Sequence, residues 1–585
     1  MVAAALFLSA CGGGGGNSQP PPPPVVPLVL SNVTNFTAST SYAIAGGGAF
    51  VLWADGSGFT SSSVLEWNGT PLSTTFGTGG ILTATVSAAL IAAPGTAQIT
   101  VKDPSESQIS NTLSFGVASQ ATATAGVMML VSVAPDGSPA NGDSLVSAAI
   151  NSTGRYVAFQ TNATNLVTGP ASGFQEIYER DTCIGASTGC APATIRITVT
   201  SDGSPVNFHS RFSAISADGR FVAFDSQATN ILPGTDVCGG LSSCVFLRDT
   251  CIGAAGGCAP STMLVSVTQS GTAVGGGAPT MSSNGRIVIF DSQSPDVVAG
   301  ETSSLGDVFA RDTCNGAPAG CSPSNTLVSL SSTGSMGNAP SNYPPATDTL
   351  GRYVAFQSNA TNLAPNVTVV PGIFLRDTCI GASTGCAPAT NRADVGSDGS
   401  QPNNGVFQVT PAISNSGRLV ALASQATNLV AQNVAGLGNI YVHDTCEGTP
   451  VGACTPSTSL VSLANDGSVG NCGSPSQALS MTPDGRFVAF DSIATNLVPG
   501  DTFAACSFED VFVRDTCFGA SSGCLPSTVR VSVANAPFPQ TPANSVSGQP
   551  AISADGHYLV FLSAATNLVA GGNGHSMVFL AKTGF

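Results

Sequence analysis

The stretch that decides the fold reads TPDGRFVAFDS at residues 482–492. A turn signal, Asp484-Gly485, precedes a short run rich in Phe, Val and Ala, which is typical of a buried strand. The same pattern reads SADGRFVAFDS at residues 216–226. It returns at seven turn glycines spaced by 65, 66, 66, 66, 68 and 71 residues, which are Gly154, Gly219, Gly285, Gly351, Gly417, Gly485 and Gly556. A period this regular indicates a repeat architecture.

Each repeat holds four short β segments, which we name strands A to D. In the unit at residues 478–533 they read ALSM at 478–481, RFVAF at 486–490, DVFVRD at 510–515 and VRVSV at 529–533. Four antiparallel strands repeated seven times form a β-propeller, in which both faces of a blade are buried against its neighbours. The sequence therefore predicts an all-β fold with a seven-bladed β-propeller of four-stranded blades over residues 127–585. Eight or six blades are the alternatives.

The two ends of the repeat region complement each other. The segment MMLVSV at residues 128–133 matches strand D but precedes the first strand A, and the last unit stops after its strand C at residues 577–581. We expect the N-terminal strand to complete the seventh blade, so that the ring closes without a free edge.

The copies of SADGRFVAF, as at residues 216–224, resemble the TolB-type, WD-like propeller repeat of bacterial envelope proteins. The resemblance covers most of the chain and implies the propeller fold. It does not choose a function, because this fold serves many.

Residues 28–118 predict a small β-sandwich before the repeats. Short β segments read FVLW at 50–53, VLEW at 64–67, LTATV at 82–86 and AQITV at 97–101, and turn signals such as Asn68-Gly69 separate them. The segments GSGF at 56–59, VLEWNG at 64–69 and SNTLSF at 110–115 resemble an IPT/TIG domain, which is an immunoglobulin-like sandwich. Trp53 and Trp67 are expected in its core, with stacking on a carbohydrate as the alternative.

The N-terminal residues predict an export signal. Residues 1–10 are a short apolar run, and Leu8-Ser9-Ala10-Cys11 resembles a bacterial lipobox, in which the cysteine receives a lipid after cleavage. The resemblance implies a signal peptide over 1–10, lipid attachment at Cys11 and an outer-membrane lipoprotein that faces the periplasm or the cell surface. Residues 11–27 contain a Gly tract and a polyproline tract and predict a tether. The lipid is the only membrane contact that we expect.

The chain has 17 cysteines, which is typical of an oxidising compartment. Six units place a Cys pair directly after strand C, and we expect each pair to form a local disulfide rather than a zinc site, because zinc favours Cys-x2-Cys spacing or nearby His. Two further pairs lie in loops that share one face of the ring, and Cys11 remains as the lipid acceptor. The expected disulfides are Cys183–Cys190, Cys251–Cys258, Cys314–Cys321, Cys379–Cys386, Cys446–Cys454, Cys517–Cys524, Cys238–Cys244 and Cys472–Cys506.

Charge is scarce and mostly acidic. Charged residues make up 9% of the 585, with 33 acidic and 17 basic residues and a net charge of −16. Arg follows the turn glycine in six units and precedes the last Asp of strand C in five, so we expect ion pairs between blades and capped turns. No basic patch remains to neutralise phosphates, which disfavours nucleic acid as a partner.

The loops that join D to A and B to C vary between units, so their face of the ring is the candidate binding surface. We expect a monomeric, envelope-anchored binding or interaction module whose partner is an envelope protein or a glycan. The alternatives are a propeller lyase or hydrolase acting on glycans or peptides, and a structural spacer. No catalytic residues are assigned. No cofactor is expected apart from a candidate calcium ion at Asp501, Glu509 and Asp510, which offer oxygen ligands.

Overall fold

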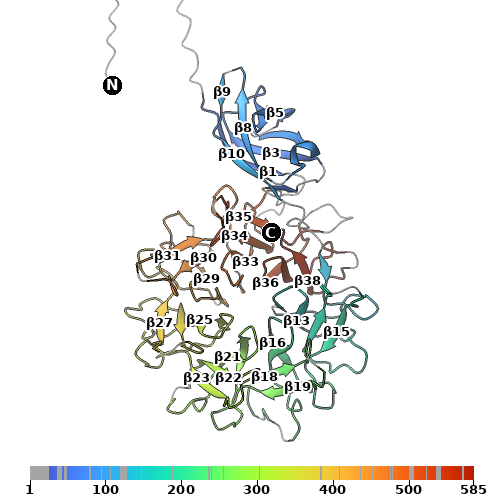
Figure 1. The fold of residues 1–585 in the computed structure, drawn as a ribbon, viewed down its shortest axis with the longest axis vertical. Coiled ribbons are helices and arrows are strands. Elements are labelled where there is room, and N and C mark those ends of the chain that lie inside the picture. The colour runs from blue at the N-terminus through green and yellow to red at the C-terminus, as the bar shows by residue number, and fades with distance from the viewer. Residues whose placement is uncertain are drawn as a thin grey trace, which may run out of the picture.

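The computed structural model describes residues 26–585 except 36–41, 45–48, 78–80, 94, 106, 119–127, 147, 187–188, 235–236, 239, 255, 302–303, 383–384, 408, 435, 451, 475, 477, 500–505, 522, 535–541 and 570–571. The described chain is almost entirely β (Figure 1). Its one helix is the single-turn 3-10 helix η1 (Ala88–Ile91). Within these residues we find no helix with the length and apolar character needed to cross a membrane.

The N-terminal part folds into two packed sheets. One has the order β1-β3-β7-β6 and the other β2-β10-β8-β4-β5, with β9 beside β8. Trp67 is buried in the core between them and packs against Phe115, with ring centroids 5.5 Å apart, whereas Trp53 is only partly buried. The strands are β1 (Val29–Asn35), β2 (Tyr42–Ile44), β3 (Phe50–Ser57), β4 (Val64–Trp67), β5 (Thr70–Pro71), β6 (Thr74–Phe76), β7 (Ile81–Val86), β8 (Gly95–Asp103), β9 (Gln108–Ile109) and β10 (Leu113–Ala118).

From residue 129 onward the described strands form seven four-stranded antiparallel sheets, which we number 1 to 7 in chain order of their strand A. Strand A is β12 (Ala149–Ile150), β16 (Ser210–Ile215), β20 (Gly277–Met281), β24 (Ala346–Thr347), β28 (Ala412–Ile413), β32 (Ser480–Met481) and β36 (Ser547–Ile552). Strand B is β13 (Tyr156–Thr161), β17 (Phe221–Ser226), β21 (Ile287–Ser292), β25 (Tyr353–Ser358), β29 (Leu419–Ser424), β33 (Phe487–Ser492) and β37 (Tyr558–Ser563).

The outer half of each sheet is made of strands C and D. Strand C is β14 (Glu176–Asp181), β18 (Cys244–Asp249), β22 (Asp307–Asp312), β26 (Gly372–Asp377), β30 (Asn439–Asp444), β34 (Asp510–Asp515) and β38 (Met577–Lys582). Strand D is β15 (Ala193–Arg196), β19 (Ser261–Leu264), β23 (Ser324–Leu327), β27 (Ala389–Arg392), β31 (Ser457–Leu460), β35 (Ser527–Arg530) and, for sheet 7, β11 (Met129–Leu130).

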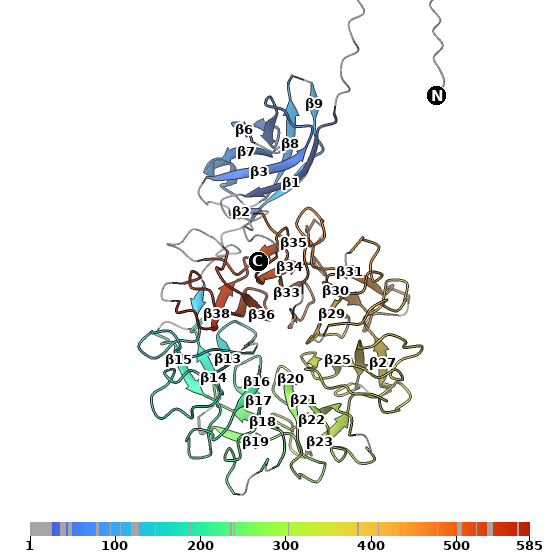
Figure 2. The same cartoon turned by 180° about the vertical axis from the view of Figure 1, so that it is seen from behind.

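The sheets lie side by side around a centre, which matches a β-propeller (Figure 1). The view from behind shows the same ring, with the N-terminal sheets beside the part that holds β35 (Figure 2). As expected from the sequence, β11 pairs antiparallel with β38, through Met129 opposite Leu580 and Leu130 opposite Phe579. The first strand of the repeat region thus completes the last sheet.

Successive residues of strand B point to opposite faces of a sheet, and both faces are buried. Phe221 packs toward sheet 3, whereas Val222 and Phe224 pack toward sheet 1. Phe224 stacks on Phe246 of strand C, with ring centroids 5.7 Å apart, and five other sheets repeat this aromatic pair. This burial explains why the strand reads as an almost continuous apolar run.

The repeated turn glycine fills a place that tolerates no side chain. Gly219 has φ of 83°, in the left-handed region, and a Cβ there would lie 2.4 Å from the ring of Tyr156 in the preceding sheet. Gly154 meets Tyr558 in the same way, which carries the packing from sheet 7 to sheet 1. The regular spacing of these glycines in the sequence therefore reflects a contact that each sheet makes with the preceding one.

All sixteen cysteines of the expected pairs form disulfides, and their partners are those that the sequence analysis expects. Six of them close the hairpin between strands C and D, with Cα atoms 5.7–5.8 Å apart. Cys11 lies outside the described residues. The eight disulfides indicate an oxidising compartment outside the cytoplasm.

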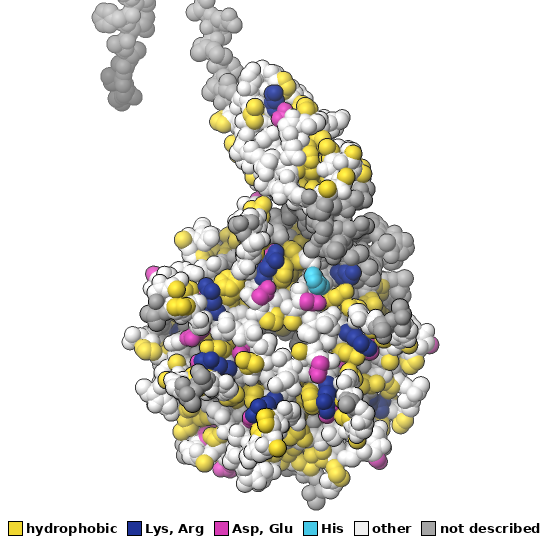
Figure 3. Space-filling view, viewed as in Figure 1, with side chains coloured by type: hydrophobic (Ala, Val, Ile, Leu, Met, Phe, Trp, Pro, Cys, Tyr) yellow, Lys and Arg dark blue, Asp and Glu magenta, His cyan; other side chains and the backbone are white. Residues whose placement is uncertain are grey.

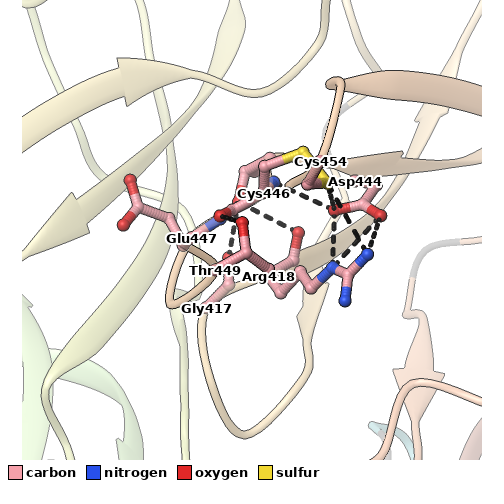
Figure 4. The surroundings of a disulfide bond; sticks show 8 residues. Gly417, Arg418, Asp444, Cys446, Glu447, Thr449 and Cys454 are labelled. Carbon is pink, nitrogen blue, oxygen red and sulfur yellow. Dashed lines mark hydrogen bonds and ion pairs between the residues drawn. A yellow bond between two sulfur atoms is a disulfide. The ribbon is translucent and has the colours of Figure 1, made fainter. Parts of the chain in front are cut away.

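The arginines that follow the turn glycines pair within a sheet, not between sheets as we expected. Arg418 donates to both carboxylate oxygens of Asp444 at 2.9 Å, and the Asp444 Oδ1 accepts the Cys446 N–H (Figure 4). Leu419 lies opposite Asp444 in the register, so Arg418 is a cross-strand neighbour of this carboxylate. The five other pairs are Arg155–Asp181, Arg220–Asp249, Arg286–Asp312, Arg352–Asp377 and Arg486–Asp515.

Candidate functional site

The face that carries the A–B turns and the C–D hairpins is occupied by these internal pairs. Basic side chains follow one another around it, each beside an acidic one (Figure 3). Groups such as Asp444, Cys446 and Cys454 come close enough to suggest a metal centre. Their sulfur atoms are joined in a disulfide, however, and a metal-binding cysteine must be a thiolate. This face is therefore a scaffold and offers few free groups to a ligand.

On the opposite face, the D–A and B–C loops are held by a repeated amide clamp. In sheet 1 the Asn141 side chain donates to Thr164 Oγ1 at 2.8 Å, and its Oδ1 accepts the Thr164 N–H at 2.7 Å. The same contact joins Asn207–Thr229, Asn338–Thr361, Asn403–Thr427, Asn471–Thr495 and Asn544–Thr566. Sheet 3 has Ser294-Pro295-Asp296 where these sheets have Ala-Thr-Asn. The clamps fix the loop bases, so that the remaining loop residues can differ.

A cavity of about 180 Å³ lies on the ring axis, at the end that carries the A–B turns. Every sheet contributes one residue from the end of strand A and one from the turn that follows, and sheet 4 adds Asp348. The inner set is mainly apolar and comprises Ile150, Ile215, Met281, Thr347, Ile413, Met481 and Ile552; the turn set comprises Ser152, Ala217, Ser283, Thr349, Asn415, Pro483 and Ala554.

Hydrogen bonds connect the turn residues from sheet to sheet. Ala217 N–H donates to Ser283 O at 2.7 Å, and Ser283 N–H donates to Thr349 O at 2.9 Å. Pro483 has no N–H to donate, and sheets 6 and 7 are joined instead by Ile552 N–H and Ser480 Oγ, 3.0 Å apart. These hydrogen bonds between neighbouring sheets hold the inner strands together at this end of the ring axis.

An aromatic cluster lies on the loop face between sheets 1 and 2. Phe174 comes from the B–C loop of sheet 1, and Phe208 and His209 precede β16 of sheet 2. The ring centroids are 5.0–5.3 Å apart, and Phe208 is 43% exposed. His209 Nδ1 accepts the Gln175 N–H at 3.1 Å, so the neutral ring presents Nε2 as its N–H donor. The loops thus offer an exposed apolar surface beside one polar nitrogen.

Acidic residues occupy the fifth position of strand B in three sheets. This position holds Gln160, Asp225, Asp291, Gln357, Ala423, Asp491 and Leu562 in sheets 1 to 7. Burial raises the pKa of Asp225 to about 7, that of Asp291 to about 6 and that of Asp491 to about 7. Carboxyl groups with such pKa values can accept or release a proton near neutral pH.

Arg211 of β16 links the aromatic cluster to these acids. It lies two residues after His209 and is paired with Asp225 in the strand register. Its positive charge lowers the pKa of Asp225, but burial has the larger, opposite effect. Arg211 therefore lies between the exposed aromatic cluster and the buried carboxyl group of Asp225.

Of the three expected calcium ligands, the structure describes Glu509 and Asp510, and their side chains contact different groups. Asp501 lies outside the described residues. Asp510 is buried, accepts the Ser532 hydroxyl at 2.5 Å and lies 3.6 Å from Arg530 Nη1. Glu509 lies beside Asp491 instead, and burial raises the pKa of its carboxyl group. The site as a whole stays a prediction.

Sequence reasoning did not single out Asp225, Asp291 or Phe174. A signal for the two acids was present, because a charged residue interrupts the otherwise apolar strand B only in some repeats, as FVAFDS at 221–226 against YVAFQT at 156–161. Phe174 and Phe208 carried no such signal. They come from different repeats, and only the loop conformations bring their rings together.

No family model matches the chain, and no curated protein does. Solved structures that match the chain include an oligogalacturonate lyase from Vibrio parahaemolyticus, at 11% identity and a TM-score of 0.40 over 78% of this chain and 98% of that one. An auxiliary nutrient binding protein from Bacteroides thetaiotaomicron matches at 9% identity and a TM-score of 0.34, over 95% of this chain and 98% of that one. A second auxiliary nutrient binding protein, from Bacteroides ovatus, matches at 8% identity and a TM-score of 0.28, over 95% of this chain and 98% of that one.

Proposed function

We propose that this protein is an envelope-anchored binding module that holds its ligand on the loop face of a β-propeller. The observation that carries the proposal is the Phe174–Phe208–His209 cluster. Exposed rings beside a polar nitrogen suit a ligand that has apolar faces and hydroxyl or amide edges, such as a glycan or a segment of an envelope protein. The opposite face supports the assignment by contrast, since its charged side chains are paired with one another.

The seven four-stranded sheets support a seven-bladed propeller, with β11 and β38 closing the ring. The resemblance of the repeat to the TolB type agrees with this architecture. The two packed N-terminal sheets and their buried Trp67 support an IPT/TIG-like domain, which would hold the propeller away from the anchor. We take the protein to be a monomer with no affinity for nucleic acid.

The anchor is tested by Cys11→Ser. If Cys11 carries the lipid, the variant loses the acceptor thiol and leaves the membrane fraction for the soluble extracytoplasmic fraction, whereas the wild type stays with the membrane. Fractionation followed by immunoblotting measures this, and Cys183→Ser with Cys190→Ser is the control for altered cysteine content. Membrane retention of Cys11→Ser would show that something other than this lipid holds the protein.

The binding site is tested by Phe208→Ala. We expect the purified protein to bind at least one member of a panel of oligosaccharides and envelope-protein peptides, and the variant to bind it about tenfold more weakly, because losing one aromatic contact costs about 1.4 kcal/mol. Isothermal titration calorimetry gives both dissociation constants. The matched control is Phe76→Ala, since Phe76 is similarly exposed, at 41%, but lies in the N-terminal sheets.

Equal affinities of Phe208→Ala and wild type would place the ligand elsewhere. Absence of binding to envelope extract as well as to the panel would favour the spacer function.

A second candidate function is a propeller enzyme acting on glycans or peptides. The observation that favours it is the pair Asp225 and Asp291 from neighbouring sheets, whose carboxylate oxygens lie 3.3 and 3.4 Å from the same point in front of Gly277. Two carboxyl groups that converge in this way suit acid and base roles. Turnover of a panel member that is lost in Asp291→Asn would establish this function in place of binding alone.

A further inference from the structure

We propose that a divalent cation, calcium by its chemistry, binds between sheets 2 and 3 at the open face of Gly277, held by Asp225, Asp291 and Ser243. This site is separate from the aromatic cluster, and it does not depend on the proposed binding function. It also differs from the calcium site that the sequence suggests at Asp501, Glu509 and Asp510.

The space in front of Gly277 is surrounded by oxygen atoms. The three heavy atoms nearest to where a Cβ would stand are Asp225 Oδ2 at 3.3 Å, Asp291 Oδ1 at 3.4 Å and Ser243 Oγ at 3.9 Å. Two are carboxylate oxygens from neighbouring sheets, and the third belongs to a hydroxyl that donates to Gly276 O at 2.8 Å and keeps lone pairs for a cation. Because residue 277 has no side chain, the place where these oxygens converge is open.

Asp225 supplies a second, independent observation. Asp225 is only 4% exposed. Its Oδ2, which faces Gly277, accepts the Ser243 hydroxyl at 3.4 Å, whereas the other oxygen of the same carboxylate, Oδ1, has no hydrogen-bond partner within the described residues. A buried carboxylate oxygen without a partner is costly, and a bound cation would remove this cost.

The backbone is shaped around the same position. The pairing of β20 with β21 shifts register between Gly277 and Thr280, and Ala278 has φ of 47°, in the left-handed region. This bulge leaves the Cβ position of Gly277 3.3 Å from Asp225 Oδ2 of the preceding sheet. The same bulge occurs in β16 at Phe212 and in β36 at Gln549, so what distinguishes sheet 3 is the set of oxygen atoms around Gly277.

In sheet 2 a cationic side chain occupies the position equivalent to Gly277. Arg211 holds in β16 the register place that Gly277 holds in β20, since each lies opposite the fifth residue of its strand B. A cationic group thus stands at this place in sheet 2, whereas sheet 3 has an oxygen-lined space. Arg211 also acts on Asp225 and offsets part of its charge, so the affinity should fall among the weaker calcium sites, with Kd of about 0.1 mM.

The donor set selects the ion. All three groups are oxygens, which suit hard cations and disfavour zinc or copper, whose sites contain nitrogen or sulfur. The oxygens come from two sheets in an irregular arrangement, and water would complete the shell. Calcium accepts such a set, whereas magnesium demands near-octahedral geometry.

The test is calorimetric titration of CaCl2 into EDTA-treated, dialysed protein. We expect one binding event in the wild type that Asp291→Asn weakens at least tenfold. Gly277→Ala should do the same, because the new Cβ occupies the place where the oxygens converge, and its φ lies outside the left-handed region. The matched control is Gly256→Ala, in the exposed C–D hairpin of sheet 2, where a Cβ would have no atom within 4 Å.

Melting curves recorded in EDTA check that each variant is folded, and added CaCl2 should raise the melting temperature of the wild type and of Gly256→Ala only. No calcium binding by the wild type would overturn the proposal. Binding that Gly277→Ala and Asp291→Asn leave unchanged would also overturn it, and would direct attention to Glu509 and Asp491. Equal binding of magnesium would overturn the choice of calcium.

Discussion

Glu179→Leu is expected to raise the free energy of unfolding at pH 7 by about 3 kcal/mol. Glu179 lies on β14, is 1% exposed, and neither of its carboxylate oxygens has a hydrogen-bond partner within the described chain. The same position of strand C is apolar in the other sheets, where it holds Leu247, Ala310, Leu375, Val442, Val513 and Leu580. Burial, with smaller effects from Asp181 and Asp218, raises the pKa of Glu179 to about 8.

The sign of the pH dependence follows from this shift. Between the ordinary pKa of about 4.5 and the folded value of about 8, the folded protein keeps a proton that the unfolded chain releases, so stability falls as the pH rises. At pH 7 the difference corresponds to the 3 kcal/mol above. Leucine has no such proton and is also the residue that three other sheets have at this position.

Urea denaturation of wild type and Glu179→Leu at pH 5, 6, 7 and 8 measures the effect. The difference in the free energy of unfolding between Glu179→Leu and wild type should increase as the pH rises. Glu179→Gln is the control that removes the charge but keeps a buried polar group, so it should share the flatter pH profile and recover less stability. A lower stability for Glu179→Leu at every pH would mean that Glu179 has a partner which holds it in place.

The second large effect is expected from removal of the closing strand. A variant without residues 28–132 lacks β11 and exposes the edge of β38, whereas a variant without 28–118 removes only the N-terminal sheets. We expect the first to be about 5 kcal/mol less stable than the second, because it loses the buried Met128 and Val131 and the hydrogen bonds of Val131 and Ser132 to Val578.

Chemical denaturation gives this difference, and size-exclusion chromatography should show association of the shorter protein through the free edge. Val131→Pro in the full chain is a milder form of the same change, since it removes the N–H that bonds Val578 O at 2.8 Å. Equal stability of the two deletion variants would mean that β11 does not hold the ring closed.

The propeller scaffold could be predicted from the sequence because the same contacts recur in every repeat. Each turn glycine contacts the preceding sheet in the same way, and each C–D hairpin with a cysteine pair brings its two cysteines together over a few residues, so spacing along the chain carries the information. The pairing of Arg418 with Asp444 was harder to assign, because a period shows that the residues recur but not whether they meet within a sheet or between sheets. Only the register of β29 against β30 decides this.

The candidate sites break the repeat, and that is why they were missed. Gly277 and Arg211 stand at equivalent places but are opposite in chemistry, and neither is informative without knowing that Asp225 lies between them. Phe174 and Phe208 belong to loops of different length. Their contact depends on loop conformations that no period describes.

The spacing of the hairpin cysteines also bears on how the chain reaches its folded state after export. The partners in six disulfides are 7 or 8 residues apart, and loops of about this size close in roughly 10–100 ns. Correct partners therefore meet far more often than distant cysteines, and oxidation can proceed unit by unit with few mispaired intermediates. By contrast, Met129 must find Leu580 across nearly the whole repeat region, and contacts of such sequence separation form late. We infer an order of events in which covalent stapling of the hairpins comes first and closure of the ring comes last.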